Sequence, residues 1–184
     1  MKTVSRSKEF HSSYNKLISL LMIIIISSAF TSGCALLPVK DSVQDFTKGY
    51  LGKVLSESLE KSGEDFPGEG DQAETELKKY LENEFGKYFT ESGLEKFETE
   101  GVFARRLEYF RENDTKKILN VIISVSLSEG SDEDEEKASY DYRIEYKAID
   151  SKNGSHKVTE SGVLEIIKER KGKYIIDSDT LNRE

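Results

Sequence analysis

The sequence predicts an α+β domain in which N-terminal helices pack on a four-stranded antiparallel sheet. Apolar residues recur at helical spacing from residue 43 to about residue 111. From residue 119 onward they alternate with polar residues, as in strands that bury one face. Helices and strands segregated along the chain in this way are typical of α+β domains.

Three helical segments are expected. The first spans residues 42–61, and a loop with Pro67 and several glycines follows at 62–70. Asp71 and Glu74 resemble a capping box that starts the second segment, whose apolar stripe reaches Tyr88. We interpret this stripe as core that faces the sheet.

The third helical segment is expected to begin at Thr90, a good N-cap residue, and to reach Arg111. Arg105 and Arg106 fall on the polar face of a continuous helix here. On that face they would pair with neighbouring glutamates at positions 100, 108 and 112.

Four strands follow, at 119–127, 140–148, 158–168 and 174–181. The first should bury one face and leave a mostly polar face outside. Asn153 and Gly154 predict a tight hairpin turn with positive φ at both residues, and Lys171 and Gly172 predict another. The acidic run 131–136, with Glu129 before it, is expected to be a solvated hairpin loop.

The first 33 residues have the pattern of an export signal. Four basic residues precede an apolar run from Leu17 to Phe30, and small residues then lead to the only cysteine, Cys34. Thr31, Ser32 and Gly33 before Cys34 resemble a bacterial lipobox, although the family usually has leucine where Thr31 stands. The resemblance implies that the Cys34 thiol receives a diacylglyceryl group and becomes the first residue of the mature protein.

Two alternatives to a lipoprotein stay open. Without cleavage, Leu17 to Leu37 is about long enough to span a bilayer, which needs roughly 20 apolar residues. The second alternative is an ordinary signal peptide followed by a buried structural cysteine. The expected organisation is therefore a signal peptide (1–33), a short lipid-anchored linker (34–42) and one domain (43–184).

Composition restricts the partners of this domain. Removal of the leader leaves 23 basic and 34 acidic residues, a net charge of −11. Such an acidic body argues against nucleic acid and against direct adsorption to anionic lipids. With Cys34 at the anchor, no cysteine remains for a disulfide.

The order of helices and hairpins, ending in the strand Lys-Gly-Lys-Tyr-Ile-Ile-Asp at 171–177, resembles the nuclear transport factor two-like superfamily. Together with the lipobox, it is similar to small exported lipoproteins of that superfamily in Gram-positive bacteria. The resemblance implies a strongly curved, cone-shaped sheet around the helices, often with a pocket. It implies no single function, because members include isomerase-like enzymes and many binding or assembly modules.

Few residues are candidates for catalysis. Tyr140, Tyr142 and Tyr146 should point into the concave side, where a pocket could use their hydroxyls, or where they simply form core. An inward acid beside them is missing unless the last strand turns Asp177 or Asp179 inward. His156, the only histidine outside the leader, is expected to be a solvated residue at a strand start.

No metal site or other cofactor is expected. Zinc would need more ligands than one histidine, and no free cysteine is left. The stretch 65–76 is partly in register with a calcium loop, but Pro67 occupies a ligand position and offers no side-chain oxygen.

The sequence therefore predicts a monomeric, lipid-anchored protein on the extracytoplasmic face of the cell membrane. It is expected to act by binding a protein of the cell envelope, without catalysis. A small-ligand carrier and an isomerase-like enzyme are the alternatives. Monomeric behaviour follows from the charged outer face of the second strand, which suits no large apolar interface.

Overall fold

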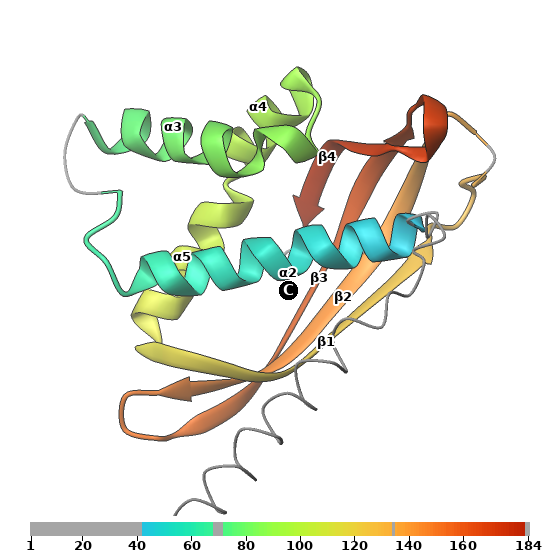
Figure 1. The fold of residues 1–184 in the computed structure, drawn as a ribbon. Coiled ribbons are helices and arrows are strands. Elements are labelled where there is room, and N and C mark those ends of the chain that lie inside the picture. The colour runs from blue at the N-terminus through green and yellow to red at the C-terminus, as the bar shows by residue number, and fades with distance from the viewer. Residues whose placement is uncertain (1–41, 68–71, 134, 183–184) are drawn as a thin grey trace, which may run out of the picture. The chain divides into compact units, whose positions relative to one another are not determined.

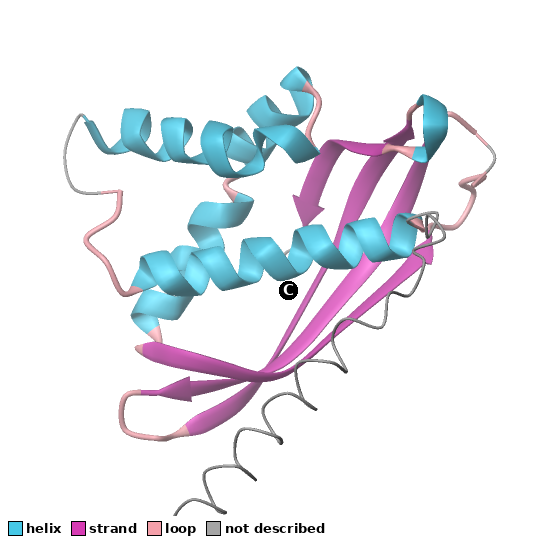
Figure 2. Cartoon of the chain, in the orientation of Figure 1, coloured by secondary structure: helices cyan, strands magenta, loops and turns pink. Residues whose placement is uncertain are grey.

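The computed structural model describes residues 42–67, 72–133 and 135–182. Helices come first along the chain, and a four-stranded antiparallel sheet follows with strand order β1-β2-β3-β4 (Figures 1 and 2). The predicted α+β class is confirmed. The signal peptide, Cys34 and nearly all of the linker lie outside the described residues, and the cone shape remains a prediction.

Helix α2 (Val43–Ser62) lies across one face of the sheet (Figure 1). It begins where the Ser42 hydroxyl accepts a hydrogen bond from the Asp45 amide at 3.2 Å, which satisfies one free donor of the first turn. One face of the helix is buried along its whole length. The buried positions are Val43, Thr47, Tyr50, Leu51, Val54, Leu55 and Ser58.

Helix α3 (Ala73–Phe85) begins after Gln72, which makes no side-chain capping bond. The predicted capping residue Asp71 lies outside the described residues. A short 3₁₀ turn, η2 (Gly86–Tyr88), then leads to Phe89, which forms an isolated bridge with Ile176 of the last strand. Of the stripe predicted as core, Leu81 and Phe85 are fully buried, whereas Leu77, Tyr80 and Tyr88 are only partly buried. Tyr80 and Phe85 pack against Phe103 of a later helix, so the expectation that this stripe faces the sheet was wrong.

The third predicted helical segment is two helices, α4 (Glu91–Glu100) and α5 (Val102–Glu112). Thr90 caps α4 as expected, because its hydroxyl accepts from the Gly93 amide at 2.9 Å. Gly101 has a φ of 64°, a left-handed conformation that glycine adopts without steric cost, and it ends α4. The prediction of one continuous helix was wrong, because this residue changes the chain direction.

The sheet is a simple meander. It consists of β1 (Thr115–Leu127), β2 (Lys137–Asp150), β3 (Ser155–Lys168) and β4 (Tyr174–Leu181), with a 3₁₀ turn, η3 (Arg170–Gly172), before β4. In the β2–β3 turn only Asn153 has positive φ, at 63°, so the expected pair of positive φ values was wrong. The Asp150 carboxylate closes this turn by accepting from the amides of Lys152 and Gly154, each at 2.8 Å.

Strand β1 departs most from its prediction. Its pairing with β2 shifts register twice, once between Thr115 and Lys117 and once between Leu119 and Ile122. Each shift adds a residue to β1, and an extra residue exchanges the two faces of a strand. The expected buried face is therefore not continuous: Leu119 pairs with Lys147 on the outer face, and Leu119 and Val121 are exposed. Leu127 pairs with the buried Tyr140 on the predicted face but is exposed at the end of the strand.

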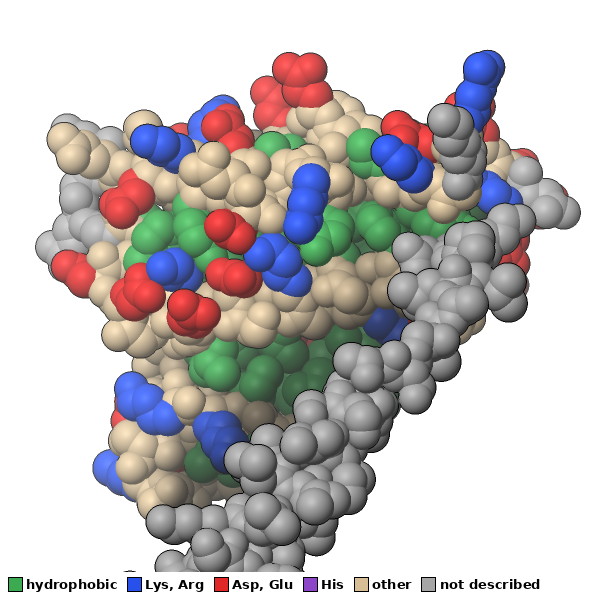
Figure 3. Space-filling model, in the orientation of Figure 1, with side chains coloured by type: hydrophobic (Ala, Val, Ile, Leu, Met, Phe, Trp, Pro, Cys, Tyr) green, Lys and Arg blue, Asp and Glu red, His purple; other side chains and the backbone are tan. Residues whose placement is uncertain are grey.

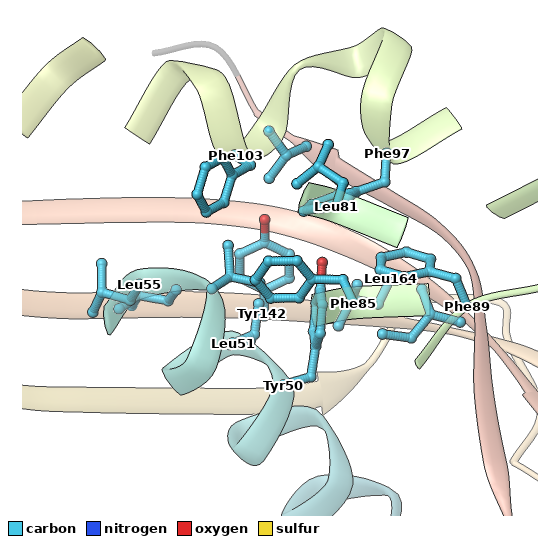
Figure 4. Packing of buried hydrophobic residues seen from close by; sticks show 14 of the residues in the cluster. Tyr50, Leu51, Leu55, Leu81, Phe85, Phe89, Phe97, Phe103, Tyr142 and Leu164 are labelled. Carbon is cyan, nitrogen blue, oxygen red and sulfur yellow. The ribbon is translucent and has the colours of Figure 1, made fainter. Parts of the chain in front are cut away.

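The core lies between the helices and the covered face of the sheet, and it is rich in aromatic rings (Figure 4). Tyr50 of α2 packs edge-on against Phe89 and Phe97, with ring centroids 5.4 and 6.3 Å apart. Phe89 stacks on Phe97 at 4.9 Å. These rings fill the interior of the domain, and a few buried polar side chains lie among them.

Candidate functional site

The three tyrosines predicted to face inward are all buried. Tyr140, Tyr142 and Tyr146 are 5%, 2% and 2% exposed, as the strict alternation of β2 predicts. The cavity beside Tyr140 has a volume of only about 10 Å³, room for one water molecule at most. Tyr140 and Tyr142 thus lie in packed core, whereas Tyr146, although equally buried, also borders a cavity of about 350 Å³ between β1, β2 and β3.

Asp179 faces inward, which the sequence predicts only if the last strand turns this residue toward the core. The β3–β4 pairing shifts register next to Glu165 and Ile166, so that Ile166 pairs with Ile176 whereas Glu165 pairs with Ser178. The extra residue in β4, Asp177, turns the following side chains to the other face. As a result both Ile176 and Asp179 are fully buried, although simple alternation would place Asp179 outside.

The Asp179 carboxylate accepts hydrogen bonds from two tyrosines. Tyr50 of α2 donates to Oδ2 at 2.6 Å, and Tyr142 of β2 donates to Oδ1 at 3.0 Å. Figure 4 shows Tyr50 and Tyr142 in the interior among the aromatic rings. Burial raises the pKa of Asp179, although the nearby Arg106 guanidinium and both tyrosine hydroxyls oppose the rise. Burial and the Asp179 charge raise the pKa values of both tyrosines.

Arg106 of α5 continues this buried polar network. Its side chain is 2% exposed, and its Nε donates to the Glu160 carboxylate of β3 at 2.6 Å. Tyr146 donates to the other Glu160 oxygen at 2.7 Å. Burial lowers the pKa of Arg106, but the Glu160 charge, the interactions with Tyr142 and Asp179 and the hydrogen bond to Glu160 together outweigh burial and raise the pKa above its ordinary value. Sequence reasoning wrongly placed Arg106 on the polar face of α5.

The signal for a buried Arg106 was present in the sequence. Once the helix restarts at Gly101, the buried residues Val102, Phe103, Leu107 and Phe110 define an apolar stripe, and Arg106 falls within it. Arg105 instead donates to the backbone carbonyl of Glu100 at 2.7 Å. Arg106 lies three residues after Phe103 and four before Phe110, on the buried face of α5, whereas Arg105 does not.

The network ties α2, α5 and three strands together. Both carboxylate oxygens of Asp179 are engaged and the residue is fully buried, so a substrate finds no open atom on it. Gly162 of β3 makes the contact possible, because a Cβ at this position would overlap the Tyr142 ring and hydroxyl. The geometry supports a brace that orients the helices on the sheet.

The remaining candidates do not converge with this network. His156 is exposed, and its Nε2 lies 2.8 Å from the Tyr109 hydroxyl. Among the described residues, no cluster of histidine or acidic side chains could hold a metal ion. None of the helices in the described ranges is long and apolar enough to cross a membrane.

A different feature is accessible to a partner, namely the outer edge of β1. Within the described part of the chain, β1 pairs with β2 on one side and with no strand on the other. Ile122 is 59% exposed, and three other large apolar residues of β1 are more than a third exposed. Figure 3 shows hydrophobic side chains gathered in a hollow beside α2 on this side of the molecule.

Comparisons with known proteins give little guidance. No protein-family model matches the chain, and no curated protein matches it in sequence. One similar solved structure is the intermembrane space region of the chloroplast protein ARC6. It has 12% sequence identity and a TM-score of 0.33, and the match covers 75% of this chain and 95% of that one. A similarity this weak carries no argument about function.

Proposed function

We propose that the protein is a membrane-anchored extracytoplasmic lipoprotein that binds another protein of the cell envelope without catalysing a reaction. The leader pattern and the lipobox-like residues before Cys34 support the anchor. The binding function rests on one observation, the uncharged outer edge of β1, which pairs with no strand in the described ranges. The filled interior around Asp179 and Tyr142 favours this function over a carrier or an isomerase that would use that interior.

The composition of β1 is unusual for this chain. Charged residues make up 34% of the sequence, yet residues 118–128 contain none over 11 consecutive positions. A long uncharged edge strand tends to pair with other chains, and proteins normally protect such edges with charges or cover. The opposite edge of the sheet has such cover, because the Thr90 amide donates to the Ile176 carbonyl at 2.9 Å.

The backbone of β1 is set for strand addition. The Ser128 amide donates to the Ser139 carbonyl at 2.9 Å, and in the same register Ser126 and Ser124 also face β2. Because alternate residues of an antiparallel strand point opposite ways, the amides and carbonyls of Ile123, Val125 and Leu127 face away from β2. An extended partner segment can bind these groups as an added strand.

The charges at the two ends of β1 define the partner further. Lys117 and Lys116, the latter paired with Asp114 at 2.7 Å, stand at its start, and the acidic residues Glu129 and Glu133 follow its end. An antiparallel partner strand would begin near these acids and end near the lysines. We therefore expect a segment of alternating apolar residues, preceded by basic residues and followed by acidic ones.

Copurification from membranes tests this function. The full chain, with its leader and Cys34, is expressed in its host together with an Ile122→Lys form and an Asp141→Lys control. Asp141 is exposed and pairs with Ser126, so the control adds a lysine to β2, one strand further from the edge. We expect one specific envelope protein to copurify with the wild type and the control but not with Ile122→Lys. Retention by all three forms, or capture by none, would refute a role for the β1 edge.

A further inference from the structure

The start of helix α2 and the end of strand β1 lie at the same end of the domain (Figure 1). Val43, the first residue of α2, and Tyr140 of β2 line the same small cavity. Tyr140 is also the pairing partner of Leu127, the last residue of β1. The chain therefore enters the domain beside the end of the outer β1 edge.

The tether ahead of this point is short. Eight residues lead from Cys34 to Ser42, the N-cap of α2, so a lipid at Cys34 would hold Ser42 within about 29 Å of the anchor, at about 3.6 Å per extended residue. An uncleaved leader that spans the bilayer to Leu37 would leave a still shorter tether. The 13 residues of β1 place its start about 40 Å from its end. Either anchor keeps the end of β1 near the membrane and leaves its start free to point away.

The charges beside β1 give the direction of an added strand. Glu129 and Glu133 follow the end of β1, on the membrane side, whereas Lys117 stands near its start. A strand that pairs antiparallel to β1 begins beside the glutamates and finishes beside the lysine. Basic residues at its beginning and acidic residues at its end complement these charges. The first residues of such a strand lie nearest the membrane.

The contact itself is narrow. The large apolar side chains that β1 exposes are Leu119, Val121, Ile122 and Leu127. A contact of this size is weak between freely diffusing proteins, whereas anchoring both chains in one membrane raises their effective concentration. The gain is largest where the two chains leave the membrane side by side, because short linkers that match the distance between two sites give the highest effective concentration.

We propose that the partner is anchored in the same membrane and that its recognition strand directly follows the anchor. The strand starts beside Leu127 and runs away from the membrane along β1, with basic residues first and alternating apolar residues next. The assignment rests on the proposed lipid anchor and on strand addition at β1. It adds where in the partner the strand lies and which way it runs.

Photo-crosslinking at the two ends of the edge tests the proposal. A photoreactive amino acid replaces Leu127 or Leu119 in the full chain within its own membrane. The control position is Lys157, an exposed residue of β3 that lies two strands further from the edge. We expect position 127 to crosslink within about ten residues of the partner's membrane anchor, and position 119 about eight residues further toward the partner's C-terminus. Position 157 should give no crosslink to this protein.

The outcomes separate this inference from the proposed function. Crosslinks in the reverse order, or to a segment remote from any membrane anchor, would overturn the inference and leave binding at the β1 edge intact. A crosslink to a second copy of this chain, or to its own residues before Ser42, would identify a different occupant and overturn both. Absence of crosslinks from positions 127 and 119 would also overturn both.

Energy transfer tests the membrane-side position of Leu127 without the partner. The only cysteine is used at the anchor, so Leu127→Cys and Lys152→Cys each offer one site for a fluorophore on the lipidated chain. Lys152 is exposed and follows Asp150, which pairs with Thr115 at the start of β1. In vesicles of phosphatidylglycerol and phosphatidylethanolamine with an acceptor dye on the headgroups, transfer from position 127 should be at least about twofold more efficient than from position 152. Equal transfer from the two positions would contradict the inference and leave the proposed function untouched.

Discussion

Gly162 offers the sharpest test of the internal brace. It lies opposite Tyr142 in the β2–β3 ladder, and a methyl group here would come closer than 3.0 Å to the Tyr142 ring, the Tyr142 hydroxyl and the Thr180 carbonyl. Two of these obstacles are stiff, since the ring is packed in the core and the carbonyl belongs to β4. Gly162→Ala must therefore displace Tyr142, β4 or both.

The expected cost combines two effects. Overpacking of a core position costs about 1–3 kcal/mol. Displacement of Tyr142 also removes its hydrogen bond to the buried Asp179 carboxylate, and a bond to a charged group is worth about 1.5–3 kcal/mol. We therefore expect Gly162→Ala to lower the free energy of unfolding by about 2.5–6 kcal/mol, a large part of the total for a domain of this size.

Urea unfolding followed by circular dichroism measures this loss, and Gly49→Ala is the matched control. Gly49 is an exposed residue within α2, and a Cβ there meets nothing within 4 Å. Alanine at this position should raise stability by about 0.5–1 kcal/mol, because glycine is the poorer helix former. If Gly162→Ala unfolds at the same urea concentration as the wild type, the packing of Tyr142 against β3 is wrong.

Four further predictions follow from the same contacts and from the leader. Tyr142→Phe should cost about 1–3 kcal/mol in urea unfolding because it leaves Asp179 with one donor, and an unchanged midpoint would contradict this. Lys137 Nζ lies 2.9 Å from Asp177 Oδ2, and this contact and the hydrogen bond from the Thr90 hydroxyl lower the pKa of Asp177 from 3.8 to about 2. That stabilisation is present above pH 3.8 and is lost as the pH falls toward 2, so Asp177→Asn should flatten the acid limb of stability against pH. An acid limb as steep as in the wild type would count against the pair. Cys34→Ala should abolish acyl labelling and processing, and persistent labelling would rule out the lipobox. Sedimentation of the purified protein should show a monomer at all concentrations, and a dimer that persists on dilution would contradict the expectation drawn from the outer face of β2.

Strand β2 shows what the sequence could predict. Its apolar and charged residues alternate without a break, and no register shift interrupts its pairing with β3. The buried positions of Tyr140, Tyr142 and Tyr146 therefore follow directly from a period of two. The order of the elements and the α+β class follow from the spacing of apolar residues, which changes from helical to alternating between residues 111 and 119.

Asp179 and the β1 face show what the sequence could not predict. One extra residue in β4 and two in β1 exchange the faces of these strands. The second shift in β1 includes Asn120, whose φ of 53° is left-handed, but the other two shifts carry no such mark in the local composition. Long-range pairing decides the position of a bulge, so a prediction from alternation alone assigns the residues beyond the bulge to the wrong face of the strand. Arg106 is different, because it lies three residues after Phe103 and four before Phe110, so the helical spacing of the sequence already places the arginine in the apolar stripe.

Site-specific photo-crosslinking tests the central claim most directly. A photoreactive amino acid replaces Ile122 on the open edge of β1, or Arg143 on the outer face of β2, in the full chain within its own membrane. Binding at the β1 edge predicts one discrete crosslinked envelope protein from position 122 and none from position 143. The crosslink should map to an extended segment of alternating apolar residues in that protein. Crosslinks from position 143 alone, or from neither position, would contradict a binding function at the β1 edge.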